Sequence, residues 1–247
     1  MNGLWAKIHK WLALLMALQI LAWFVSGLVM AGLPIERVRS EHMKAPAPPA
    51  PVRLDIAATG LARLARDGLS GERIEIRTLM GRAVALIVPR EGRPRLYDLA
   101  TGHAVGPISA TAAARIAETD HAGHVRARSV TRITENDSEY RAALPAWRVD
   151  FDDGANRAIY VAADTGAVTA RRSTLWRVYD FLWGLHIMDW RHHENFNSWL
   201  LIIATALALI LTISGIVMLP GRLGYPAWRR RRRALSAARR PSGDPPA

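Results

Sequence analysis

The sequence predicts an α+β membrane protein in which two transmembrane helices flank a soluble domain built from two α-β-β-β units. Two long apolar runs, residues 11–33 and 199–219, are the first indication. Each is long enough to cross a hydrocarbon layer of ~30 Å as a helix. Between them, one helix-like segment followed by short segments of alternating apolar and polar residues occurs twice in the same order.

The first apolar run follows a short basic leader, residues 1–10, which contains Lys7 and Lys10. A secretory signal peptide has a shorter apolar core and a small-residue cleavage site soon after it. Neither feature fits residues 11–33, so we expect an uncleaved transmembrane helix. The two lysines then place the N-terminus in the cytoplasm.

The basic charge of the chain is concentrated in its last segment. Residues 220–247 carry eight arginines against the single Asp244, whereas the whole chain has a net charge of +12. This distribution indicates membrane topology rather than nucleic-acid binding, because a run of arginines resists translocation and keeps the C-terminus in the cytoplasm. The tail is most simply a disordered topogenic segment, and the alternative is a docking site for anionic lipid or a partner protein.

The soluble part begins after a linker, residues 34–52, whose proline-rich stretch 46–51 predicts a stiff polyproline spacer. The first unit is predicted over residues 53–107 and closes with the turn Thr101-Gly102. Its expected elements are a helix at 54–67 and strands at 73–79, 83–88 and 95–99.

The second unit is predicted over residues 108–170, with Ser109 as the N-cap of its helix. Its expected elements are a helix at 111–118 and strands at 125–133, 146–151 and 157–161. The turn Thr165-Gly166 closes it, 64 residues after Thr101-Gly102, which predicts an internal duplication. Each unit has few core residues, so we expect the two sheets to pack on each other or on their helices.

An amphipathic interfacial helix and loop are predicted over residues 174–197, before the second transmembrane helix at 198–219. A helix over 175–190 would place His186 on its most aromatic face. The residues that share this stripe, at spacings of three, four or seven, are Tyr179, Leu182, Trp183 and Trp190. Most other tryptophans are expected to form an interfacial aromatic belt.

Two stretches resemble the PepSY domain, a small module of bacterial envelope proteins: Leu-Pro-Ala-Trp-Arg-Val-Asp-Phe-Asp-Asp-Gly at 144–154 and Ile-Tyr-Val-Ala-Ala-Asp-Thr-Gly at 159–166. The apolar segments resemble PepSY-associated transmembrane proteins. The residues that carry this second resemblance are His9-Lys10-Trp11, Ser26-Gly27, Leu185-His186 and Ser214-Gly215.

This resemblance implies a function, because some members of the group are inner-membrane reductases that hold haem b between membrane histidines and reduce ferric siderophores. It implies haem b as cofactor, a ferric siderophore or another periplasmic acceptor as substrate, and a role in iron acquisition. The electron donor would be a quinol or a separate reductase. Those reductases have four or more spans and this chain has two, so a homodimer is expected.

The histidines expected to ligate haem iron are His9 and His186, since the chain has no cysteine. His9 and Ser26-Gly27 are separated by roughly 26 Å of helix, which puts them in opposite leaflets. Span two runs the other way, so Ser214-Gly215 is expected near His9 and Ser26-Gly27 near His186. Each leaflet would then hold one histidine and one small-residue notch for a flat porphyrin, with Trp183 and Trp190 as further haem contacts.

Other interpretations of these residues remain open at this stage. His192 and His193 are rival ligands, and Asp189 is placed to orient the Nδ1 proton of His186. Gly27 and Gly215 are equally consistent with close helix packing, and His9 and His186 with ordinary interfacial residues. The remaining histidines are expected at the surface: His42, His103, His121 and His124.

The alternative function is a non-catalytic, membrane-anchored module that binds or regulates another envelope protein. The chain has no dinucleotide fingerprint, P-loop or zinc-protease motif. No nucleotide-dependent or zinc-protease chemistry is therefore indicated, and electrons for a reductase must come from outside the chain.

Overall fold

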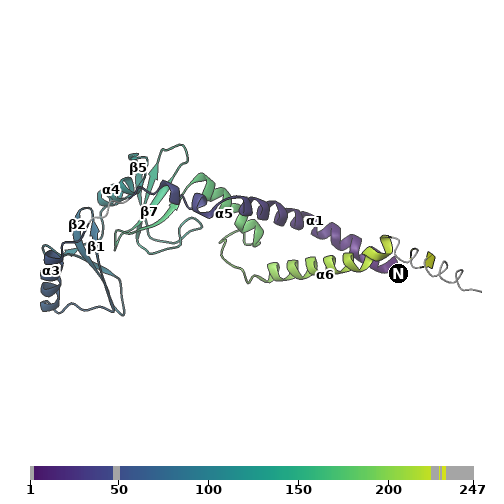
Figure 1. Ribbon diagram of the computed structural model, residues 1–247, viewed down its shortest axis with the longest axis horizontal. Coiled ribbons are helices and arrows are strands. Elements are labelled where there is room, and N and C mark those ends of the chain that lie inside the picture. The colour runs from purple at the N-terminus through teal and green to yellow at the C-terminus, as the bar shows by residue number, and fades with distance from the viewer. Residues whose placement is uncertain (1–2, 47–50, 224–227, 229, 232–247) are drawn as a thin grey trace, which may run out of the picture. The chain divides into compact units, whose positions relative to one another are not determined.

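A computed structural model describes residues 3–46, 51–223, 228, 230 and 231 (Figure 1). The chain divides into two compact units, and each is considered by itself. The first, called the helical unit, comprises residues 1–27, 185–189 and 194–247. The second, called the soluble unit, comprises residues 28–184 and 190–193. Part of the predicted polyproline spacer, residues 47–50, and most of the arginine tail lie outside the described residues.

The two apolar runs form the long helices α1, Gly3–Gly32, and α6, Trp199–Arg222. Ala6–Gly32 and Trp199–Pro220 are both long and apolar enough to cross a membrane. Most of their side chains are not covered by protein, as expected for helices whose large apolar groups face lipid. Both predicted spans are therefore helical, and the predicted leader is itself the first part of α1 from Gly3 onward.

The first repeat is a helix followed by an antiparallel sheet with strand order β1-β2-β3-β4. Its elements are α3 Leu54–Arg66, β1 Arg73–Leu79, β2 Arg82–Val88, β3 Arg95–Asp98 and β4 Ala104–Val105. The second repeat has the same order of elements, with strand order β5-β6-β7-β8. Its elements are α4 Ala110–Asp120, β5 Ala127–Ile133, β6 Ala146–Phe151, β7 Ala158–Ala162 and β8 Val168–Arg172.

The predicted order α-β-β-β lacks the last strand of each repeat. β4 has only two residues, too few to show an alternation of apolar and polar residues in the sequence. β8 contains two arginines, so its sequence is polar; one of them, Arg171, bonds to Asp120 of α4. The Thr-Gly turn before each of these strands is present in both repeats. Gly102 and Gly166 have φ values of +77° and +67°, a left-handed conformation that glycine adopts without strain.

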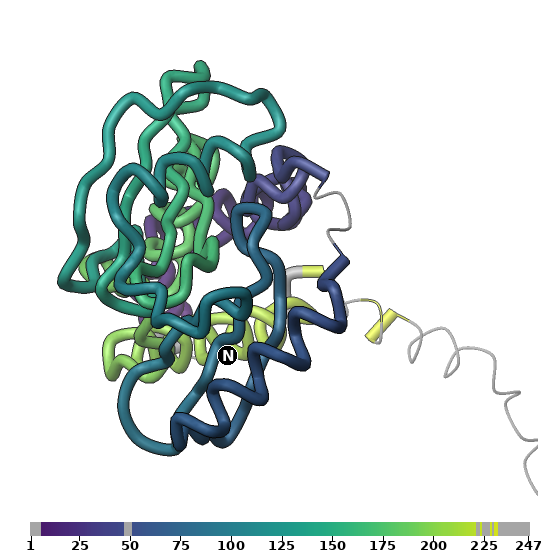
Figure 2. Tube along the Cα trace, turned by 90° about the vertical axis from the view of Figure 1, so that its left-hand side faces the viewer, coloured from purple at the N-terminus to yellow at the C-terminus, as the bar shows by residue number. Residues whose placement is uncertain are grey.

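The soluble unit has its main core between the two sheets. Val84, Leu86 and Leu96 of the first sheet join Ile116 of α4 and Phe151 of the second sheet in one buried cluster. Figure 2 shows α3, in dark blue, along the first sheet, where a separate cluster that includes Leu64 and Leu99 covers the opposite face. The expectation that the sheets pack on each other and on their helices is confirmed.

The second repeat is tied to the segment that follows α1. This segment contains the short helices α2, Ile35–Val38, and η1, Glu41–Met43. The N–H of Ala45 donates to the carbonyl of Asp120 at 2.7 Å, and the N–H of Ala122 donates to the carbonyl of Met43 at 2.9 Å. The segment that precedes the first repeat in the sequence therefore contacts the second repeat.

Candidate functional site

Two histidine–serine pairs lie within the helical unit. Nδ1 of His9 on α1 is 2.7 Å from Oγ of Ser214 on α6. Nδ1 of His186, the last residue of helix α5 (Thr174–His186), is 2.9 Å from Oγ of Ser26 on α1. The predicted proximity of each histidine to its Ser-Gly pair is thus confirmed, and the two pairs have the same chemistry.

The serine hydroxyls determine where the imidazole proton lies. Oγ of Ser26 donates to the carbonyl of Ala22 at 2.6 Å, and Oγ of Ser214 donates to the carbonyl of Leu211 at 2.8 Å. A hydroxyl has one proton, so each serine oxygen accepts from the histidine and Nδ1 is the donor. Nδ1 of each ring therefore carries a proton, and in a neutral imidazole this arrangement leaves the lone pair for metal binding on Nε2.

Each glycine of the Ser-Gly pairs lies against the edge of an imidazole. A Cβ atom added at Gly27 would be 3.6 Å from Cε1 of His186, and one at Gly215 would be 3.3 Å from Cε1 of His9. Each glycine therefore lets an imidazole ring lie close to the helix that bears the Ser-Gly pair. The hydrogen bond between the serine and Nδ1 holds the ring so that Cε1, the next ring atom, lies beside the glycine.

A tryptophan of α1 completes the His186 site. Nε1 of Trp23 donates to the backbone carbonyl of His186 at 2.7 Å, which satisfies one of the free carbonyls at the end of α5. Trp23 and Ser26 are one helical turn apart and hold the backbone and the ring of the same residue. Trp23 was expected in the interfacial aromatic belt, and its spacing from Ser26 is the sequence signal for this second role.

The predicted helix over 175–190 is wrong at its C-terminal end. α5 stops at His186, and Met188 has a positive φ of 55°, which does not continue a helix. Trp190 is 64% exposed beyond this turn and does not share the helical stripe. Trp183 is on α5, and its Nε1 donates to the carbonyl of His193 at 3.1 Å.

The same early stop explains two further corrections. Oδ2 of Asp189 accepts from the N–H groups of Glu194 and Asn195, both at 3.0 Å, while Ser26 occupies the position at His186 Nδ1 that Asp189 was expected to fill. Nδ1 of the rival ligand His193 is 2.5 Å from Oδ2 of Asp180 in the soluble unit. The other rival, His192, is exposed.

Comparison with known protein families decides the family of the chain. Residues 6–240 match the model of the PepSY-associated TM region. The chain belongs to this family. Comparison with curated proteins and with solved structures gives no match. The predicted resemblance and the predicted architecture of two apolar helices around an α+β domain are thereby confirmed.

One histidine of this PepSY-associated protein is placed differently from the prediction. His121 was expected at the surface with His42, His103 and His124; those three are exposed, but His121 is 1% exposed. Its Nδ1 accepts from the N–H of Gly123 at 3.0 Å, and its Nε2 is 3.0 Å from Oδ2 of Asp153. Burial of Asp153 acts to raise its pKa, but the hydrogen bonds from His121 and Arg157 outweigh this and lower the pKa to about 2.

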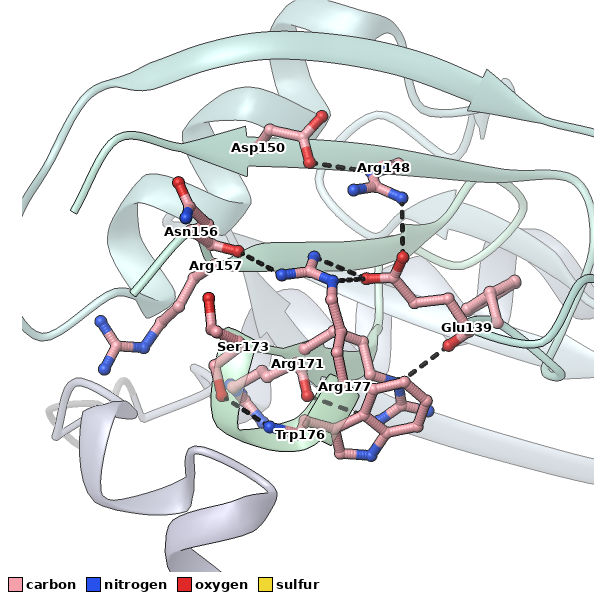
Figure 3. A network of polar contacts seen from close by, with 12 residues as sticks. Glu139, Arg148, Asp150, Asn156, Arg157, Arg171, Ser173, Trp176 and Arg177 are labelled. Carbon is pink, nitrogen blue, oxygen red and sulfur yellow. Dashed lines mark hydrogen bonds and ion pairs between the residues drawn. The ribbon is translucent and has the colours of Figure 1, made fainter. Parts of the chain in front are cut away.

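An ionic network on the second sheet of the PepSY-associated protein anchors the start of α5 (Figure 3). Glu139 accepts from Nη2 of Arg177 on α5 at 2.7 Å and from Nη1 of Arg148 on β6 at 3.0 Å. The guanidinium of Arg172 lies 4.1 Å from the ring centroid of Trp176. Sequence reasoning missed this network because its members come from a loop, two strands and a helix that no local pattern connects.

Proposed function

We propose that this protein is a haem b electron-transfer component of the bacterial inner membrane that reduces a ferric siderophore or another periplasmic acceptor in iron acquisition. The observation that carries the proposal is the shared state of His9 and His186. Nδ1 of each ring is held by a serine hydroxyl, and no described protein group hydrogen-bonds to its Nε2. Family membership supports a role in the membrane, and the histidine chemistry supports the choice of cofactor.

The residues of both pairs fit an axial ligand of haem iron. Such a ligand binds through a neutral imidazole nitrogen, and its other nitrogen normally donates to a nearby acceptor that fixes the ring. Ser214 and Ser26 are those acceptors, and Ser26 is fully buried. Among the described residues, no protein group hydrogen-bonds to Nε2 of either histidine. When bound, haem would supply one-electron Fe(III)/Fe(II) chemistry.

The two histidines are proposed to lie at two different depths of the membrane. His9 pairs with the last part of α6 and His186 with the last part of α1. Seventeen residues separate His9 from Ser26, which corresponds to roughly 26 Å of helix. We propose that His9 serves the cytoplasmic leaflet and His186 the periplasmic leaflet, so that electrons cross in two steps from a quinol or a separate reductase.

A second copy of the chain would complete each site. One chain offers one imidazole at each depth, whereas a haem held between two histidines would need a second imidazole there. In a two-fold dimer the same residue of both copies meets at the axis, so His9 would face His9 and His186 would face His186. Four helices from two chains would then form the bundle.

The test is the optical spectrum of the full-length protein purified from cells grown with ample iron and haem precursor. The proposal predicts a red protein with a Soret band that shifts on reduction. The matched control is His42→Ala, which removes an exposed histidine and is expected to leave the spectrum unchanged. A colourless, folded protein would contradict the proposal and favour the anchored regulatory module.

A further inference from the structure

A cavity of about 480 Å³ lies between the two repeats of the soluble unit. Four segments contribute to its wall: the segment after η1, the end of β1, the end of α4, and the turn into β8. The lining residues used below are Lys44, Arg77, Leu79, Asp120, Val168 and Arg171. The size is within the range of small-molecule binding sites.

The charges of this cavity do not balance. Arg171 and Asp120 neutralise each other through two hydrogen bonds, one of them at 2.6 Å from Nε of Arg171. Arg77 donates to the backbone carbonyl of Thr165, and neither Arg77 nor Lys44 makes an ion pair with a described residue. Two positive charges therefore line the cavity without a carboxylate partner in the part of the chain that the structure describes.

Arg77 carries the more unusual environment of the two. Its Nε atom is enclosed by protein and has no hydrogen-bond partner. Buried polar atoms nearly always have a partner. Arg77 as a whole is only partly buried, and the rest of its side chain lines the cavity. A partly buried cation that lines a cavity without a carboxylate partner among the described residues favours an anion in that cavity.

Much of the rest of the wall is apolar, although Thr78 and Thr119 also line it. Leu79 ends β1 and Met80 follows it, and Ile116 and Val168 extend the apolar surface on the second repeat. An inorganic anion would leave this surface in contact with water, whereas an organic anion would bury it. The lining thus favours a ligand with a carbon skeleton and more than one negative group.

We propose that this cavity binds a small organic dicarboxylate, with one carboxylate on Arg77 and the other near Lys44. Arginine is suited to this role because its planar guanidinium donates two parallel hydrogen bonds to a carboxylate. The site is independent of the histidine pairs, and it would make the soluble unit a sensor or receptor for anionic metabolites.

The experiment is calorimetric titration of the full-length protein in lipid nanodiscs with phthalate, an aromatic dicarboxylate. The expected result is saturable binding of phthalate and at least ten-fold weaker binding of phthalamide, which has the same ring without charge. Arg77→Gln and the exposed-site variant Lys44→Gln should each weaken phthalate binding by about ten-fold. Arg73→Gln on the same strand, whose side chain is exposed, should leave it unchanged.

Three results would overturn the proposal. The first is the absence of phthalate binding to the wild-type protein. The second is equal affinity for inorganic phosphate, which would show that the apolar wall does not contribute. The third is an unchanged affinity in Lys44→Gln, which tests the site even if Arg77→Gln fails to fold.

Discussion

At the scale of single residues, the two histidine sites use one arrangement twice. In each site a serine hydroxyl donates its proton to a backbone carbonyl of its own helix. The oxygen of the same hydroxyl then accepts from Nδ1 of a histidine on another segment. The adjacent glycine lets the imidazole approach the helix backbone. The consequence is a fixed tautomer and a fixed ring orientation, both of which an axial ligand requires.

Replacement of Ser26 by alanine tests this arrangement. The variant removes the acceptor for His186 Nδ1, and loss of such a partner typically weakens metal binding 10–100-fold. We expect a lower haem content at the His186 site and a shifted midpoint potential, measured by redox titration of the purified protein.

The matched control is Thr212→Ala. The Thr212 hydroxyl donates to the carbonyl of Ala208 on its own helix and is exposed, so its removal takes away a similar group without touching a histidine. Identical haem content and potential in Ser26→Ala and the wild type would show that the hydrogen bond has no role at the site.

At the scale of elements, the His121–Asp153 pair connects the end of α4 to the loop between β6 and β7. The side chain of Asp153 is 4% exposed, and the arginine of the same loop, Arg157, also bonds to it. Because four donors, from His121, Ala155 and Arg157, surround this carboxylate, its ionised form is favoured in the folded protein.

This pair predicts acid sensitivity of the soluble unit. The pKa of Asp153 is lowered from its ordinary 3.8 to about 2 in the fold, so its contribution to stability is present above pH 3.8 and is lost as the pH falls toward 2. The contribution corresponds to about 2 kcal/mol. Thermal melts of the wild type between pH 5 and pH 2 should show this loss, and Asp153→Asn should melt lower at pH 5 with a smaller acid dependence.

The neighbouring variant Asp152→Asn serves as control, since Asp152 is exposed. It should melt like the wild type at every pH. If Asp153→Asn keeps the full acid dependence, another carboxylate is responsible and the pair does not set the stability of this region.

Most elements could be predicted from the sequence because their periods are local. Val149 and Phe151 alternate with polar residues along β6, and Ser109 caps α4 through its bond to the N–H of Ala112, as expected. The pairing of His9 with Ser214 was predictable because helix rise is regular. The end of α5 depends on the conformation at Met188, and the Glu139 network depends on tertiary contacts, so neither has a local signal.

At the scale of the whole molecule, the proposed topology places both termini in the cytoplasm and the soluble unit in the periplasm. The chain has no cysteine, so single cysteines can be introduced as reporters. Arg126→Cys replaces a side chain that is 92% exposed on the soluble unit, and Lys7→Cys replaces an exposed residue near the N-terminus. A membrane-impermeant maleimide added to spheroplasts should label Arg126→Cys alone.

Labelling of Lys7→Cys in intact spheroplasts, with Arg126→Cys protected, would reverse the topology. The histidine sites would then serve the opposite leaflets. As a control, disruption of the membrane should make both cysteines react with the maleimide, which would confirm that each is accessible.

The most direct measurement of the central claim is the number of haems per chain in the wild type and in two single variants. A dimer that holds one haem between paired His9 residues and one between paired His186 residues contains about one haem per chain. His9→Ala and His186→Ala should each retain about half of that amount, and the double variant should have none. A folded wild-type protein without haem, or full haem content in the double variant, would contradict the account.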